Sequence, residues 1–169
     1  LLALGREKKR KYYLVGKKAP CSTKSLIVLP RPKKIAALST THIAMLSELG
    51  SLDKVVGVSK LAQIFSGETK KRLLSSKVVE FDYPLRPERV YKASPDIIFA
   101  HEYAGIRKDL SARFTVINIS DYLEGQPLGR MEWIIFFGVL LGKEKEALHF
   151  FNRVSFAYEK IKEKMKKVK

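Results

Sequence analysis

The sequence predicts an α/β protein in which a mostly parallel sheet is followed by a long helix. Between Lys34 and Ile119, short apolar runs alternate with helical segments, which is the pattern of successive β–α units. After Pro127 the periodicity is helical only. The run from Ile35 to His42 also leads a buried strand directly into the first turn of a helix.

Five apolar runs predict buried strands, and four segments between them predict helices. The strands are expected at residues 34–38, 55–58, 78–80, 97–100 and 115–119. The helices are expected at residues 41–49, 68–75, 87–93 and 107–112. Pro87 suits a first helical turn because no backbone donor is needed there. Five strands with four crossover connections predict one compact set of layers.

The C-terminal part of the chain predicts a hydrophobic helix and then a long, one-sided one. Residues 131–141 are apolar nearly all round, and after Gly142 apolar residues recur every three or four positions up to Val168. A helix of roughly 25 residues is about 37 Å long. Two interpretations stay open from this pattern: a strut to a second lobe, or a terminal helix packed on its own domain.

The net charge of +16 is unevenly distributed along the chain. Residues 1–35 carry +10 and residues 151–169 carry +5, whereas residues 36–150 carry only +1. Basic ends of this kind are typical of solvated tails and helix surfaces, so no nucleic-acid partner is expected. Within the N-terminal end, Tyr12 and Tyr13 precede a Leu-Val pair, which is typical of an edge strand.

Three hydroxyls and an imidazole lie where the first predicted strand meets its helix. They belong to Ser39, Thr40, Thr41 and His42. The first turn of a helix has unpaired N–H groups and the positive end of the dipole, so these residues can cap the helix or hold a ligand oxygen. In open α/β sheets this is also the edge at which ligands bind.

Three segments resemble a family of transport proteins. Residues 34–58 hold a strand, a Ser-Thr-Thr-His turn, a helix ending in Leu-Gly and a strand ending in Val-Gly-Val. Residues 87–100 hold Pro-Glu-Arg-Val and then Ser-Pro-Asp-Ile-Ile, and residues 121–133 run from Asp-Tyr-Leu-Glu-Gly-Gln-Pro to Met-Glu-Trp. In this order they resemble the substrate-binding proteins of ABC importers for iron–siderophore complexes, haem and cobalamin, whose two α/β lobes are joined by one long helix.

The resemblance covers residues 26–169 and implies the domain organisation. It implies a basic segment over 1–25, a Rossmann-like three-layer ligand-binding lobe over 26–142, and an inter-lobe helix over 143–169. The resemblance further implies that this sequence holds the first lobe and the helix without the second lobe of such proteins. Because their ligand is held between two lobes, the resemblance implies weak binding or no binding by a chain of this length.

The resemblance places the ligand against loops that follow the carboxyl ends of the strands. It implies ligand contacts from Ser39, Thr40, Thr41, His42, Lys60, Tyr83, His101, Glu102, Tyr103 and Tyr122. Tyrosine rings offer a large rigid surface to a flat ligand, and Lys60 offers a cation to an anionic one. Ordinary structural roles are the alternatives: Ser39 as a helix cap, Lys60 as a solvated loop residue and Tyr83 as packing for its turn.

Glu88 has a separate role in the resemblance, in which an acidic residue at this place docks into arginines of the membrane permease. Such a rim charge sets orientation and association rate. The alternative is a carboxylate that the helix dipole stabilises in the first turn after Pro87.

The implied function is capture of a ferric siderophore, haem or cobalamin and its delivery to an ABC importer permease. The resemblance implies no catalysis and no cofactor. It also implies a periplasmic or other extracytoplasmic location, peripheral to the membrane. Lipid anchoring stays open, as does self-association through the uncovered face of the terminal helix.

Direct metal binding is one alternative. His42, His101 and Glu102 are ligand types that suit zinc or manganese if the fold brings them together. His101 or Tyr103 would equally suit the axial position of haem. The single Cys21 excludes an internal disulfide framework and a multi-cysteine metal site, and no role is assigned to it.

An enzyme is the alternative from another class. A small hydrolase or transferase would use the Ser39–His42 turn as an anion cradle with His42 as base, oriented by Asp82 or Asp121. The sequence contains no Gly-x-Ser-x-Gly, Walker or Gly-x-Gly-x-x-Gly pattern. The sequence therefore favours a binding protein over an enzyme.

Overall fold

The computed structural model describes residues 2–4, 11–15, 26–29 and 31–166. The chain divides into two compact units, Leu1–Ser120 and Asp121–Lys169. The domain boundary expected from the sequence at Gly142 stays a prediction. The hydrophobic segment before that glycine belongs with the long helix that follows it, because the two helices pack on each other.

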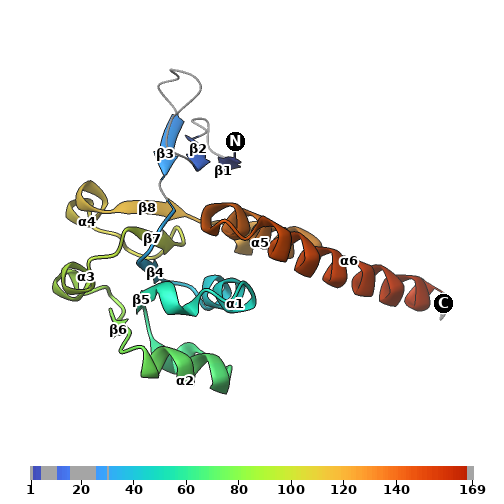
Figure 1. The fold of residues 1–169 in the computed structure, drawn as a ribbon, viewed down its shortest axis with the longest axis horizontal. Coiled ribbons are helices and arrows are strands. Elements are labelled where there is room, and N and C mark those ends of the chain that lie inside the picture. Colours follow the sequence, from blue (N-terminus) through green and yellow to red (C-terminus); the bar gives the residue numbers. More distant parts are fainter. Residues whose placement is uncertain (1, 5–10, 16–25, 30, 167–169) are drawn as a thin grey trace. The chain divides into compact units, whose positions relative to one another are not determined.

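The first unit contains the predicted parallel sheet, and all five strands are present (Figure 1). The elements in chain order are β4 (Ile35–Ala37), α1 (Thr40–Glu48), η1 (Leu52–Lys54), β5 (Val55–Val58), η2 (Leu61–Gln63), α2 (Gly67–Ser75), β6 (Val79–Glu80), α3 (Pro87–Ala93), β7 (Ile97–Ala100), α4 (Lys108–Arg113) and β8 (Thr115–Asn118). The strand order is β6-β5-β4-β7-β8, and every pair is parallel. The fold class predicted from the sequence is confirmed.

Helices cover both faces of this sheet. Crossovers between parallel strands are right-handed, so helices change face where the order of strands reverses. Ile98 of β7 packs in one cluster with Val90 of α3 and Leu110 of α4. The neighbouring Phe99 points the other way, and its ring meets His42 of α1 at a centroid distance of 6.4 Å. The two faces of β7 are therefore covered by different helices, α3 and α4 on one face and α1 on the other.

Gly57 allows the ring of Phe81 to lie directly on β5. A Cβ placed on Gly57 would collide with the Phe81 ring, which is fully buried. This contact explains the glycine in the Val-Val-Gly-Val strand, since a side chain there would take the place of the ring. Phe81 in turn begins the loop between β6 and α3.

Asp96 ties the start of β7 to the start of β4. Its Oδ2 accepts hydrogen bonds from the backbone N–H groups of Lys33 at 2.8 Å and Lys34 at 2.9 Å. The Asp96 N–H also donates to the Lys34 carbonyl at 2.8 Å. The Pro-Asp pair of the sequence therefore has a structural role at the amino ends of the two central strands.

Replacing Asp96 by alanine is expected to lower the free energy of unfolding by about 1–3 kcal/mol, because two charge-assisted hydrogen bonds are lost. Asp96→Asn keeps an acceptor oxygen and should lose less than half as much. Urea unfolding followed by circular dichroism measures both. Equal stability of wild type and Asp96→Ala would show that these bonds do not hold the strands in register.

The second unit consists of η3 (Asp121–Leu123), α5 (Pro127–Leu141) and α6 (Glu144–Lys166). Gly142 has a positive φ of 71° and ends α5. Gly138 of α5 meets Ala147 of α6 so closely that a Cβ on the glycine would clash. The predicted long helix is confirmed as the 23-residue α6.

Much of α6 is open to solvent in the structure, and its exposed apolar side chains include Leu148, Phe156, Ile161 and Met165. No helix in the described residues is long and apolar enough to cross a membrane. The sequence-based expectation that this face supports self-association stays a prediction.

A second, three-stranded sheet is formed by β1 (Leu2–Leu4), β2 (Lys11–Val15) and β3 (Leu26–Leu29). The strand expected at Tyr12 and Tyr13 is present as β2. It pairs antiparallel with β1 and parallel with β3, so it is central in this sheet and not an edge strand. Cys21 lies outside the described residues.

Candidate functional site

The order of the five parallel strands defines a crevice at the carboxyl edge of the sheet. The chain runs from β4 outward to β6 and then crosses back to β7 on the other side of β4. Loops that leave β4 and β7 therefore diverge to opposite faces and leave a gap between them. Ligands of open α/β proteins bind at such a switch point.

A pocket of about 220 Å³ lies at this edge. Four loops line it, namely those that follow β4, β5, β6 and β7. Its lining residues are Leu38, Ser59, Gln63, Tyr83, Leu85, His101 and Ala104. Sites that enclose a drug-sized ligand have about 300–1,000 Å³. The pocket is therefore suited to hold part of such a ligand, as one wall of a larger site.

The pocket combines polar groups with apolar surface. Ser59, Gln63, Tyr83 and His101 supply a hydroxyl, an amide, a phenol and an imidazole, and no Asp, Glu, Lys or Arg is among the lining residues that the structure describes. The Ser59 hydroxyl donates to the Leu38 carbonyl at 3.3 Å, which links the loops after β5 and β4. These groups can donate to and accept from ligand oxygens without a fixed charge.

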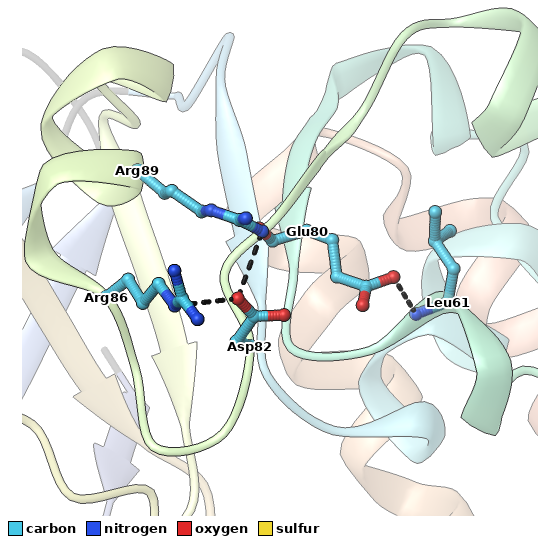
Figure 2. Close-up of polar contacts among 5 residues, drawn as sticks. All are labelled: Leu61, Glu80, Asp82, Arg86 and Arg89. Carbon is cyan, nitrogen blue, oxygen red and sulfur yellow. Dashed lines mark hydrogen bonds and ion pairs between the residues drawn. The ribbon is translucent and has the colours of Figure 1, made fainter.

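The loop between β6 and α3 is held by a cluster of ionic contacts (Figure 2). One carboxylate oxygen of Asp82 lies 3.0 Å from Nε of Arg86 and 3.1 Å from Nη1 of Arg89. Asp82 itself has a positive φ of 65°, a conformation that aspartate tolerates better than most residues. This turn directs the following residues, Tyr83 and Leu85, into the pocket wall.

Tyr83 links two of the lining loops. Its hydroxyl donates to the Tyr103 carbonyl at 3.3 Å, across from the loop after β6 to the loop after β7. The Ala104 N–H donates to the His101 carbonyl at 2.9 Å and closes the turn of that second loop. The Tyr83 side chain is still 57% exposed, so its ring remains open to a ligand.

Comparison with known proteins identifies the family to which the chain belongs. The family model described as periplasmic binding protein matches residues 35–169, most of the chain. The chain belongs to this family of periplasmic binding proteins. The matched range includes both the pocket and α6.

Individual relatives agree with this assignment. An uncharacterized lipoprotein of Methanocaldococcus jannaschii is 26% identical over 133 residues, covering 72% of this chain and 32% of that protein. The structure of a possible iron-binding periplasmic solute-binding protein from Staphylococcus epidermidis matches with a TM-score of 0.63 and 26% identity, covering 78% of this chain and 50% of the other.

The petrobactin-binding protein YclQ of Bacillus subtilis matches with a TM-score of 0.66 at 16% identity, which shows a shared fold. The match covers 82% of this chain and 48% of YclQ. The chain thus spans about half the length of the solved relatives and about a third of the curated one.

Of the site residues predicted for this periplasmic binding protein, Tyr83 and His101 are brought together in the pocket. Glu102 and Tyr103 are exposed beside it in the loop after β7. Lys60 is half-buried at the start of η2 and is not among the lining residues.

The hydroxyl residues of the predicted turn have capping roles. The Ser39 side chain accepts from the Thr41 N–H at 3.4 Å and lies 2.9 Å from the Thr41 hydroxyl, so Ser39 is the N-cap of α1. Thr40 and Thr41 are exposed, and none of the three lines the pocket. Their role as ligand contacts stays a prediction.

His42 differs from the expectation. It was expected to face the ligand or to be partly exposed, but its side chain is 0% exposed and packs against the edge of Phe99. The turn of α1 that follows Ser39 directs this position toward the sheet. His42 is therefore enclosed in the core, and within the described residues it forms no metal-binding group with His101 and Glu102. Its role as a ligand contact stays a prediction.

Two other predicted residues lie elsewhere. Glu88 is exposed in the first turn of α3, as either of its interpretations requires. Tyr122 is half-buried within η3, in the second unit. The expected contribution of Tyr122 to ligand binding stays a prediction.

Gln63, Leu85 and Ala104 line the pocket but were not predicted. The signal for them was their place in loops that follow strands, which the sequence shows but does not resolve residue by residue. The position of Gln63 in the lining depends on the short helix η2, and that of Leu85 depends on the turn at Asp82.

A second hollow lies between α1 and α2 and has a volume of about 500 Å³. Its lining includes Thr40, Glu48, Phe65, Glu68 and Arg72. It is larger than the switch-point pocket, but it is a groove between helices in which acidic and basic side chains are mixed. Because ligands of open α/β proteins bind at the carboxyl edge of the sheet, the switch-point pocket is the better candidate for the ligand site.

No group of three or more His, Cys, Asp or Glu residues within the described part of the chain is placed to hold a metal ion. Away from the pocket, a hydrogen bond from the Arg107 side chain lowers the pKa of Asp109 in the first turn of α4.

Proposed function

We propose that this chain provides one wall of the ligand site of an importer-associated solute-binding protein, and that its ligand is a metal chelate. A ferric siderophore is the first candidate, with haem and cobalamin as related ligands. The observation that carries the proposal is the pocket at the sheet switch point, with Tyr83 and His101 in its lining, in a chain of the periplasmic binding protein family.

The lining suits a chelate better than a small free ion. A chelated metal presents ligand oxygens and flat organic surface in place of open coordination positions. Tyr83 offers a ring for that surface, while Gln63 and His101 offer hydrogen bonds to the oxygens. The possible iron-binding solute-binding protein from Staphylococcus epidermidis supports iron as the cargo.

The observations support capture without catalysis. The proposed base of the enzyme alternative, His42, is fully buried, and Asp82, one of its two suggested orienting partners, is engaged by Arg86 and Arg89. Direct capture of zinc or manganese has no comparable support, since the buried His42 does not group with His101 and Glu102 within the described residues.

The family and a relative named as a lipoprotein support an extracytoplasmic location. Attachment to the membrane by a lipid would keep such a protein close to a permease. We include it in the proposal as the form in which the protein acts.

Binding is tested by isothermal titration of the chain with a ferric trihydroxamate, a ferric tris-catecholate, haemin and cyanocobalamin. One wall should bind one of these selectively, with a Kd on the order of 0.1–1 mM. Because the net charge is +16, the titrations are repeated in about 0.5 M salt, which screens nonspecific attraction. Failure to bind any of the four, or equal binding that salt abolishes, would contradict the proposal.

Delivery is proposed to use Glu88 as a docking point for a basic patch of the permease. Glu88→Lys reverses a rim charge, so uptake of the chelate by cells should fall about tenfold while chelate binding is unchanged. Glu132→Lys changes an equally exposed carboxylate on α5 and serves as the control. Uptake of radioactive iron measures the effect, and equal uptake by both variants would exclude docking through Glu88.

A further inference from the structure

Two loops that line the pocket are tied to a cluster of residues that does not itself line it. The cluster consists of Glu80, Asp82 and Arg89, at the end of β6 and the start of α3 (Figure 2). None of the three is a lining residue. We name this group the β6 cluster.

The first loop is held by the Glu80 side chain. Its Oε2 accepts from the Leu61 N–H at 2.9 Å in a partly buried position. Leu61 begins η2, and the same loop carries Ser59 before it and Gln63 after it into the pocket. The Glu80 carboxylate thus fixes the middle of the loop whose two ends line one side of the pocket.

The second loop is held by Arg89. Its Nη1 donates to the Glu80 carbonyl at 2.8 Å and lies 3.1 Å from the Asp82 carboxylate. One nitrogen therefore joins the end of β6 to the turn at Asp82. The residues that follow this turn, Tyr83 and Leu85, form another side of the pocket.

The charge pair by itself does not explain the importance of Arg89. The side chains of Arg89 and Asp82 are 40% and 27% exposed, and exposed ion pairs contribute little to stability. The planar guanidinium instead fixes direction, because it must satisfy a carbonyl and a carboxylate at once. The Glu80 carbonyl accepts from this guanidinium, while the Glu80 side chain accepts from the Leu61 N–H in the other loop.

We propose that Glu80 and Arg89 are positioning residues that set the spacing of the two pocket walls, so that ligand affinity depends on side chains outside the pocket. The link to affinity rests on the proposed function. The positioning itself does not, because it is a property of the chain without ligand.

Hydrogen exchange of single backbone amides tests the positioning. Glu80→Leu should speed exchange of the Leu61 amide about tenfold, since its acceptor is lost. Arg89→Met should speed exchange of the Arg86 amide about tenfold. This amide donates to the Phe81 carbonyl at 2.9 Å, and the bond closes the second loop. Amides of β7 should exchange at the wild-type rate in both variants.

Two variants control for general loosening of the fold. Glu80→Gln keeps an acceptor oxygen and should preserve the slow exchange of Leu61. Arg113→Met removes an exposed arginine from the last turn of α4 and should change neither loop. Unchanged exchange in Glu80→Leu and Arg89→Met would overturn the proposal. Equal loss of protection in Glu80→Gln and Glu80→Leu would overturn it as well.

The consequence for binding is measured with the gallium(III) complex of desferrioxamine, a diamagnetic trihydroxamate chelate. Its affinity should fall about fivefold in Glu80→Leu and Arg89→Met, but not in Glu80→Gln. Faster exchange with unchanged affinity would overturn the claim that the walls control binding. If the wild-type chain does not bind this chelate, the proposed function fails for it, and the exchange rates alone decide the positioning.

Discussion

Replacing Gly57 by valine is expected to destabilise the first unit by about 3 kcal/mol, the upper part of the range for overpacked cores. A side chain at this position must displace the ring of Phe81, which is fully buried and is bordered by the β6–α3 loop. The ring cannot swing to solvent without leaving a cavity. The midpoint of urea unfolding should fall while its slope stays the same.

Gly67→Val provides the matched control for this substitution. A Cβ on Gly67, at the start of α2, meets no atom within 4 Å, so the added side chain has space. Its effect on stability should stay within about 0.5 kcal/mol of wild type. If Gly57→Val unfolded at the wild-type urea concentration, the packing of Phe81 on β5 would be contradicted.

Removing the two pocket groups Tyr83 and His101 together is expected to weaken chelate binding by about thirtyfold or more. Truncating an aromatic side chain that anchors a ligand typically weakens the free energy of binding by about 2 kcal/mol or more. Tyr83 has a largely exposed ring, and His101 is only half-buried, so the double alanine variant should stay folded. Isothermal titration with the chelate that the wild-type chain binds measures the loss.

Tyr91→Ala controls for the loss of an exposed tyrosine outside the pocket. Tyr91 lies on α3, and its ring packs against Phe114 with centroids 5.5 Å apart. Its removal should leave affinity unchanged. If Tyr91→Ala weakened binding as much as the pocket variant, the effect would come from the fold in general and not from contact with the ligand.

The sheet was predictable from the sequence because parallel strands buried on both faces are nearly continuous apolar runs. Ile97–Ala100 is such a run, and all four residues are buried. The resemblance to importer binding proteins, which places the ligand at the carboxyl ends of such strands, then gave Tyr83 and His101 as candidates without any knowledge of distances. Pocket residues such as Gln63 and Leu85 could not be singled out, because the paths of their loops depend on hydrogen bonds between distant residues.

For His42, the helical periodicity of apolar residues indicates the burial of the side chain better than its position near a loop does. It precedes Leu46 and Leu49 by four and seven residues, and all three are buried on the same side of α1. The polar Ser-Thr-Thr sequence before it suggested a ligand-facing turn. The side chain instead follows the apolar stripe of the helix.

The division into compact units differs from the domain boundary expected at Gly142, which stays a prediction. The sequence marks Gly142 clearly as the end of a helix, but the end of a helix is not the end of a packing unit. The contact of Gly138 with Ala147 joins α5 to α6 across this glycine. Contacts between two small residues nine positions apart leave no periodic signal of their own.

The most direct test of the switch-point pocket as a ligand wall is amide chemical-shift mapping of the ¹⁵N-labelled chain with the gallium(III)–desferrioxamine complex. Weak binding is sufficient for this measurement. The largest shifts are expected at the pocket residues Ser59, Gln63, Tyr83, Leu85 and His101. Largest shifts in the groove between α1 and α2 or along α6, with none at the pocket, would contradict the proposed site.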